Sequence, residues 1–140
     1  MHDRILNALQ KNRNGLCVAA TIGEGGQPQS AVLAFAVLND LSIILATSYK
    51  TRKWENLKKN PKIALSFGWS FSEPNLQYEG TAKLLENGDE FKELDKIYFE
   101  KHPEIMEFRD GKTVIIKVTP HWIRLSDYSV QPPKIDELSL

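Results

Sequence analysis

Residues 45–67 read LATSYKTRKWENLKKNPKIALSF and contain three successive patterns. An apolar run ends at Thr47, a basic turn rich in hydroxyls follows, and residues 51–59 carry apolar side chains at helical spacing. Pro61 ends that helix because the residue before a proline avoids helical geometry. A second apolar run begins at residue 63. The stretch therefore predicts a strand, a short helix and another strand.

The start of this expected helix is unusually basic, with Arg52 and Lys53 in its first turn. Backbone N–H groups at a helix start already carry partial positive charge, so each cation there costs a few tenths to about 1 kcal/mol. A bound anion would reverse the sign of that cost. Hydroxyls on Thr47, Ser48 and Thr51 add short donors, so the segment predicts a phosphate site. The alternative is a solvated basic turn in which Thr51 only caps the helix.

Outside this stretch the chain reads mostly as short strands joined by turns. Helical spacing predicts two further helices at residues 2–13 and 88–102, and the glycine-rich residues 23–28 suit a hairpin turn. The tail at residues 131–140 is polar and could be mobile or cover a partner. A single mainly β domain spanning residues 1–140, a small barrel or sandwich, follows from this order. The expected strands are residues 16–22, 30–38, 41–47, 63–69, 76–85, 113–118 and 122–125.

Composition narrows the classes of function. Eighteen basic and eighteen acidic residues give a formal net charge of zero, which argues against a nucleic-acid-binding protein. The N-terminus lacks a signal-type apolar run and no membrane segment is expected, so a cytoplasmic location is expected. The single Cys17 lies in an apolar run and is expected to be buried and reduced. The three histidines lack metal-ligand spacing, and no metal site is expected.

Residues 45–67 closely resemble the signature of the pyridoxamine 5'-phosphate oxidase-like family of FMN-binding split barrels. The segment KWENLKKNP at residues 53–61 matches the family pattern Lys-x-x-Asn-Leu-x-x-Asn-Pro. The segment EGTA at residues 79–82 resembles the family's Glu-Gly-x-Ala element, and VTP at residues 118–120 resembles part of its closing strand. The order and spacing of these short motifs make the resemblance fairly specific, and it covers residues 16–128.

This resemblance implies an antiparallel split β-barrel with a few short peripheral helices. It also implies a homodimer that binds FMN in clefts between the two subunits. Backbone around Val32 and Leu33 would approach the flavin ring, and Asn75 would reach the cofactor from the partner chain. The residues that would hold the phosphate are Thr47, Ser48, Arg52 and Lys53.

The chain departs from the oxidase that gives this family its name. The oxidase carries arginine and lysine where this chain has Ser30 and Phe35, and tryptophan where it has Ser126. The family's Arg-Leu-His-Asp-Arg ending is also missing, so pyridoxamine-phosphate oxidase activity itself is not expected. We expect an FMN-dependent oxidoreductase acting on an unidentified small molecule. The alternatives are an FMN storage or sensing protein without turnover, and the same fold binding haem or a deazaflavin coenzyme.

Overall fold

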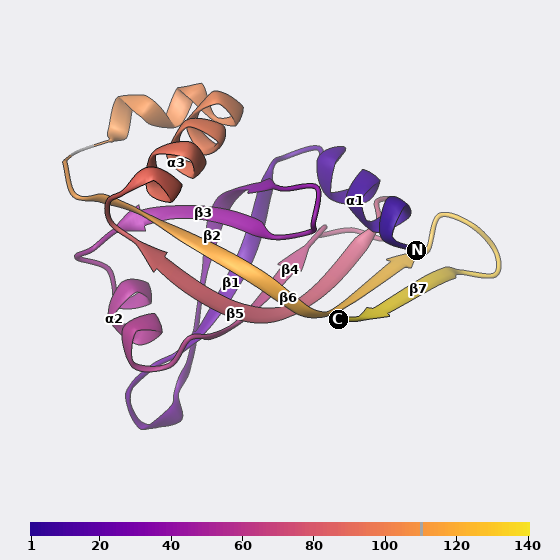
Figure 1. The fold of residues 1–140 in the computed structure, drawn as a ribbon. Coiled ribbons are helices and arrows are strands. Elements are labelled where there is room, and N and C mark those ends of the chain that lie inside the picture. The colour runs from indigo at the N-terminus through magenta and orange to yellow at the C-terminus, as the bar shows by residue number, and fades with distance from the viewer. Residues whose placement is uncertain (110) are drawn as a thin grey trace.

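Seven strands form one antiparallel sheet that closes on itself (Figure 1). The computed structural model describes residues 1–109 and 111–140. Strand neighbours run in the order β3-β2-β1-β4-β5-β6-β7, and the additional pairing of β3 with β6 closes β1 to β6 into a six-stranded barrel. The strands are β1 (Leu16–Ile22), β2 (Pro28–Val37), β3 (Ile43–Ser48), β4 (Lys62–Phe67), β5 (Asn75–Leu85), β6 (Thr113–Asp127) and β7 (Lys134–Ser139). This arrangement confirms the predicted fold class.

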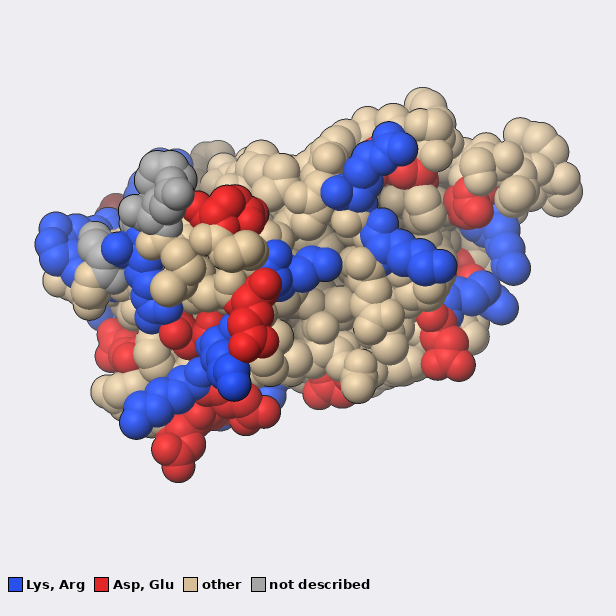
Figure 2. Space-filling view, turned by 90° about the horizontal axis from the view of Figure 1, so that it is seen from above, with Lys and Arg blue, Asp and Glu red and all other residues tan. Residues whose placement is uncertain are grey.

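Short helices surround the barrel. Of these, α2 connects β3 to β4, and α3 packs over β3 on the outer side of the barrel (Figure 1). None of the described helices is long and apolar enough to cross a membrane. Basic and acidic side chains intermingle on the face shown in Figure 2, as the zero net charge suggests. The helices are α1 (His2–Gln10), α2 (Arg52–Lys59) and α3 (Asp89–Lys101), with 3-10 turns η1 (Glu24–Gly26) and η2 (Pro103–Phe108).

Side chains fill the interior of the barrel. Alternate residues of β1 and β4 point inward, as the period of a strand requires. Phe67 packs edge to face against Phe35 and Tyr78, with ring centroids 4.7 and 6.2 Å apart. The Tyr78 hydroxyl donates to the carbonyl oxygens of Leu41 at 2.7 Å and Val118 at 3.2 Å. A large ligand must therefore lie outside this filled barrel.

One error in the sequence interpretation concerns β6. Residues 113–118 and 122–125 belong to a single strand, and a bulge shifts its register against β5 between Glu79 and Gly80. Pro120 lies between the segment of β6 that pairs with β3, which ends at Val118, and the segment that pairs with β7. A proline is tolerated there because on that side β6 has no neighbour that needs its missing N–H.

For residues 134–139 the structure contradicts the first of the two alternatives for the tail, a mobile extension. Residues 134–139 form β7, which pairs with residues 122–127 of β6. Leu138 packs against the main core. Asp136 accepts two hydrogen bonds of 2.6 Å from Arg4, so β7 is tied to α1 at the other end of the sequence.

Candidate functional site

The barrel opens where β2 and β3 diverge. The two strands pair only from Phe35–Leu45 to Val37–Ile43, whereas β2 continues to pair with β1 back to Pro28. Beyond Leu45, β3 continues along β6. The start of α2 lies beside this opening. A hollow of about 290 Å³ lies there, lined by Thr21, Gln29, Ser30, Ala31, Thr51, Arg52 and Lys53.

The turn between β3 and α2 is held by its own hydroxyls. Thr51 Oγ1 accepts from Trp54 N at 3.4 Å, so Thr51 is the helix cap, and it donates to the Ser48 carbonyl at 3.0 Å. Thr47 Oγ1 lies 3.1 Å from Thr51 Oγ1 and must be the donor, because the Thr51 proton is already engaged. Ser48 Oγ accepts from Lys50 N at 3.2 Å. Within residues 1–109 and 111–140 the Ser48 hydroxyl donates to no acceptor, so its proton is available to a ligand, whereas those of Thr47 and Thr51 hold the turn.

Positive charge gathers at this turn, because Glu55, the acidic residue of the first turn of α2, pairs with Lys58 at 3.7 Å and not with Arg52 or Lys53. Neither Arg52 nor Lys53 forms an ion pair or a side-chain hydrogen bond within residues 1–109 and 111–140. Burial, followed by the nearby charge of Arg52, lowers the pKa of Lys53. The backbone N–H groups of both residues also lack partners in that part of the chain, as expected for a first helical turn. These groups fit a phosphate, whose charge would offset the repulsion between the two cations.

Asn56 anchors α2 to the barrel, a role that the sequence did not reveal. Its Nδ2 donates to Thr21 Oγ1 at 2.9 Å and to Gln29 Oε1 at 2.8 Å. These bonds join α2 to β1 and β2 beside the hollow. The only available signal was the asparagine in the segment of residues 53–61, which lies three positions after Lys53.

The other predicted site residues lie on two different parts of the barrel. Val32 is 59% exposed on β2 and Leu33 is half-buried against the core, both on the strand that leads to the hollow. Asn75 begins β5 at the opposite end of the barrel from α2. A single chain thus brings together residues 47–53 and β2 but leaves Asn75 apart.

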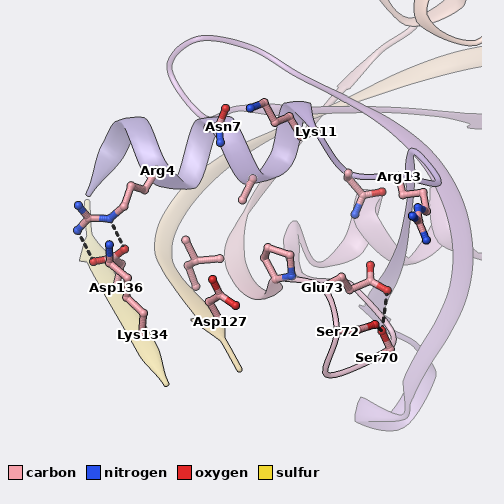
Figure 3. Close-up of a pocket in the computed structure, with 14 residues that line it drawn as sticks. Arg4, Asn7, Lys11, Arg13, Ser70, Ser72, Glu73, Asp127, Lys134 and Asp136 are labelled. Atoms are coloured by element: carbon pink, nitrogen blue, oxygen red, sulfur yellow. Dashed lines mark hydrogen bonds and ion pairs between the residues drawn. The ribbon is translucent and has the colours of Figure 1, made fainter. Parts of the chain in front are cut away.

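Asn75 is bonded to two residues that line a second cavity, Ser70 and Glu73, and this cavity of about 710 Å³ is drawn in Figure 3. The Nδ2 atom of Asn75 donates to the carbonyl oxygens of Ser70 at 3.0 Å and Glu73 at 3.3 Å. The cavity lies between α1, the loop of residues 70–74 and the ends of β6 and β7. Figure 3 shows Arg4 reaching from α1 to Asp136, and the cavity is lined by basic and acidic side chains together. Sequence patterns missed it because its walls come from both ends of the chain.

Elsewhere in the described part of the chain, the ionisable groups do not form a reaction centre. Cys17 is buried, as predicted, and burial raises the pKa of its thiol to about 12. Among the described residues, no three His, Cys, Asp or Glu side chains gather as a metal site would require. His102 is buried and bonded to a backbone carbonyl. The basic corner at residues 47–53 is the best-defined candidate binding site.

Comparisons with known proteins identify the family of the chain. A family model described as pyridoxamine 5'-phosphate oxidase matches residues 1–127. A pyridoxine/pyridoxamine 5'-phosphate oxidase from Bacteroides fragilis is 33% identical over 86 residues, which are 61% of this chain and 34% of that protein. A second such enzyme, from Actinobacillus succinogenes, is 36% identical over 84 residues, or 60% of this chain and 38% of that protein. The matched stretch therefore spans only a little over a third of each relative.

Solved structures show the same fold. A pyridoxamine 5'-phosphate oxidase-related, FMN binding protein from Nostoc punctiforme has a TM-score of 0.73 and 11% identity, covering 99% of this chain and 95% of that one. A heme binding protein from Mycobacterium smegmatis has a TM-score of 0.80 and 12% identity, covering 99% of this chain and 58% of that one. At such identities the likeness concerns the fold alone. Because the family model covers most of its length, the chain belongs to the pyridoxamine 5'-phosphate oxidase family.

Proposed function

We propose that this protein binds FMN and transfers electrons between the flavin and a small molecule. The observation that carries the proposal is the pair of cations Arg52 and Lys53, which lack an ion-pair partner in the described part of the chain, at the capped start of α2 beside the opening between β2 and β3. Membership of the family and the fold shared with an FMN binding protein support the same ligand.

In this proposal the phosphate of FMN binds at the basic corner, residues 47–53. The planar guanidinium of Arg52 and the ammonium of Lys53 provide charge-assisted hydrogen bonds, and the first-turn N–H groups and the Ser48 hydroxyl complete the donor set. Thr47 and Thr51 contribute by holding the turn that presents these donors. Asn56 fixes α2 against β1 and β2, and thereby fixes the distance of the cations from the barrel wall.

The flavin ring would lie along the free edge of β2. Phe35 N donates to the Gly15 carbonyl on the β1 side, so strand alternation directs the Ala34 N–H and both backbone groups of Val32 toward the opening, while the Ala34 carbonyl accepts from Tyr98. Backbone N–H and C=O groups in that position suit the pyrimidine edge of a flavin, and the apolar Val32 side chain suits its flat face. Bound FMN would supply the redox chemistry, and the protein would position it and limit its access to water.

A homodimer is part of the proposal because an apolar surface lies on the outer side of the sheet. Val18 is paired with Val32 and Ala20 with Ala64 in the register of neighbouring strands, and all four side chains are partly or fully exposed. Such a surface suits a second copy of the chain. Asn75 lies at the far end of its own barrel, so it would meet a cofactor only across the subunit boundary.

The substrate is proposed to differ from pyridoxamine phosphate. Phe35 is 2% exposed and packs against Phe67, so the position at which the oxidase has a cation contributes only to the core here. Within the described residues of the basic corner, no side chain is placed as an evident proton donor or base. A protein that stores or senses FMN without turnover is the remaining alternative within the same site.

The test is an absorption spectrum of the purified protein, followed by FMN titration of Arg52→Ala/Lys53→Ala. Losing two charge-assisted contacts is expected to weaken FMN binding by about a hundredfold or more. The ligand-free variant should be as stable as the original protein or slightly more stable, because two cations leave a helix N-terminus. The matched control is Lys58→Ala/Lys59→Ala, which removes the same charge from the other end of α2 and should leave FMN affinity within about threefold.

Equal FMN affinities in the two double variants would overturn the assignment of the basic corner as the phosphate site. Reduction of the bound flavin by NADH or NADPH, with reoxidation by an acceptor, would support the oxidoreductase over the storage protein. Haem is the second candidate ligand because the heme binding protein shares the fold. A spectrum dominated by a haem band in place of flavin bands would favour it.

A further inference from the structure

Next to the opening of the barrel, α3 covers the outer surface of β2 at Ala34 and Ala36, whereas Val32 stays exposed. A second apolar cluster joins Leu94, Tyr98 and Phe99 of α3 to residues of β2, β3 and β6 on the outer side of the barrel. Figure 1 shows α3 above β3, on the side away from α1. The helix therefore packs on the part of β2 where its pairing with β3 ends.

At that point Tyr98 donates a hydrogen bond to a backbone carbonyl of β2. The β2–β3 ladder ends at the pair Phe35–Leu45, and Ala34 is the next residue of β2. The Ala34 carbonyl is directed away from β1, and the buried Tyr98 hydroxyl donates to it at 3.3 Å. The hydroxyl thus occupies a position where a longer ladder would have a β3 N–H group.

His102, four residues further along, holds the next carbonyl. Its Nε2 lies 2.7 Å from the Phe35 carbonyl oxygen and must carry the proton, because a carbonyl only accepts. Gly15 makes room for this ring, since a Cβ at Gly15 would lie 2.9 Å from His102 Cε1. Gly15 also has a φ of +64°, which favours glycine. Two buried donors, Tyr98 in α3 and His102 just after it, therefore bind the consecutive carbonyls of Ala34 and Phe35 in β2.

We propose that Tyr98 and His102 are positioning residues that set the free edge of β2 against the flavin. This inference rests on the proposed function, because it assumes that the flavin lies along that edge. Tyr98 ends the β2–β3 ladder and keeps the opening wide, while His102 fixes the same strand where β1 begins. Neither residue contacts the cofactor, and both act through the backbone of residues 32–35.

The test compares two buried tyrosines whose hydroxyls bind backbone carbonyls. Tyr98→Phe removes the bond to Ala34, and the matched control Tyr78→Phe removes bonds to Leu41 and Val118 in the barrel interior. Tyr98→Phe is expected to weaken FMN binding about two- to tenfold and to shift the flavin absorption bands and reduction potential. Tyr78→Phe is expected to lower the melting temperature and leave the affinity and the spectrum of bound FMN unchanged.

A second comparison uses His102. His102→Gln keeps an N–H donor and should retain more FMN affinity than His102→Leu, which keeps none. Hydrogen exchange without any flavin gives an independent readout. In Tyr98→Phe the amides of β2 should exchange faster than in the original protein, whereas in Tyr78→Phe any increase should centre on residues 38–42.

The outcomes separate this inference from the proposed function. If the original protein binds no FMN, the proposed function fails, and the exchange experiment still reports whether Tyr98 holds β2. If the original protein binds FMN but Tyr98→Phe matches it in affinity, spectrum and β2 exchange, the positioning role is overturned. Equal losses of FMN affinity in Tyr98→Phe and Tyr78→Phe would also overturn it, because they would show only a general effect of stability.

Discussion

The ion pair between Arg4 and Asp136 joins the two ends of the chain, and Arg4→Ala tests how much that contact contributes (Figure 3). Two charge-assisted hydrogen bonds of 2.6 Å connect the side chains, of which Asp136 is 8% exposed and Arg4 50%. Hydrogen bonds to charged groups contribute about 1.5–3 kcal/mol, whereas exposed ion pairs contribute about 0.2–1 kcal/mol. Because solvent screens this half-exposed pair, we expect Arg4→Ala to lower the stability of the folded protein modestly. In a domain of 140 residues such a loss lowers the melting temperature by a few degrees.

The effect of Arg4→Ala should depend on pH in a defined direction. The hydrogen bonds and charge of Arg4 lower the pKa of Asp136. A carboxyl whose pKa is lowered by folding stabilises the protein above its unfolded pKa of about 4. That contribution is lost as the pH falls through the lower folded value. The stability difference between the original protein and Arg4→Ala should therefore be constant near neutral pH and shrink in acid below about pH 4.

Urea unfolding followed by circular dichroism at a series of pH values would measure this difference. Arg13→Ala is the matched control, because Arg13 lines the same cavity but forms no ion pair with any described residue. We expect its effect to stay within about 0.5 kcal/mol. A difference that grows as the pH falls, or an equal loss in Arg13→Ala, would refute the reasoning.

Two further predictions concern α2 and the thiol. Asn56→Leu removes the bonds to Thr21 and Gln29 and should lower the free energy of unfolding by about 1–3 kcal/mol and weaken FMN binding; a melting curve with a flavin titration checks it, and unchanged FMN affinity would contradict the anchoring role. Because burial raises the pKa of Cys17 to about 12, the folded protein should react with a thiol reagent at pH 8 only through unfolding. Equal reaction rates in buffer and in urea would contradict that.

Local sequence patterns were sufficient for most of the barrel. Residues 16–22 were predicted as a strand and form β1 with those bounds, because alternate side chains are buried along it. The basic corner could also be predicted from the sequence, since a cap residue, two cations and a following Pro61 lie within a short stretch. Both depend on neighbours in the chain, so a single sequence carries the information.

The extent of β6, the formation of β7 and the contact of His102 with β2 depended on tertiary structure. The sequence predicted two strands at residues 113–118 and 122–125, yet β6 continues through Pro120 because its neighbour changes from β3 to β7 at that point. The polar tail became β7 through pairing with β6 and contact with Arg4. His102 is bonded to a carbonyl 67 positions away, a contact that no local pattern announces.

The sequence by itself determined the order of β1 to β5 and of the three α-helices, the family and the position of the basic corner, because these follow from side-chain periodicity and short motifs. Only the tertiary structure decided where β2 and β3 separate, which groups of α3 and its end hold β2, and that Asn75 lies far from α2. These features arise from contacts between segments remote in sequence. Backbone pairing and buried hydrogen bonds of that kind are specified by the whole packed chain and by no single segment of it.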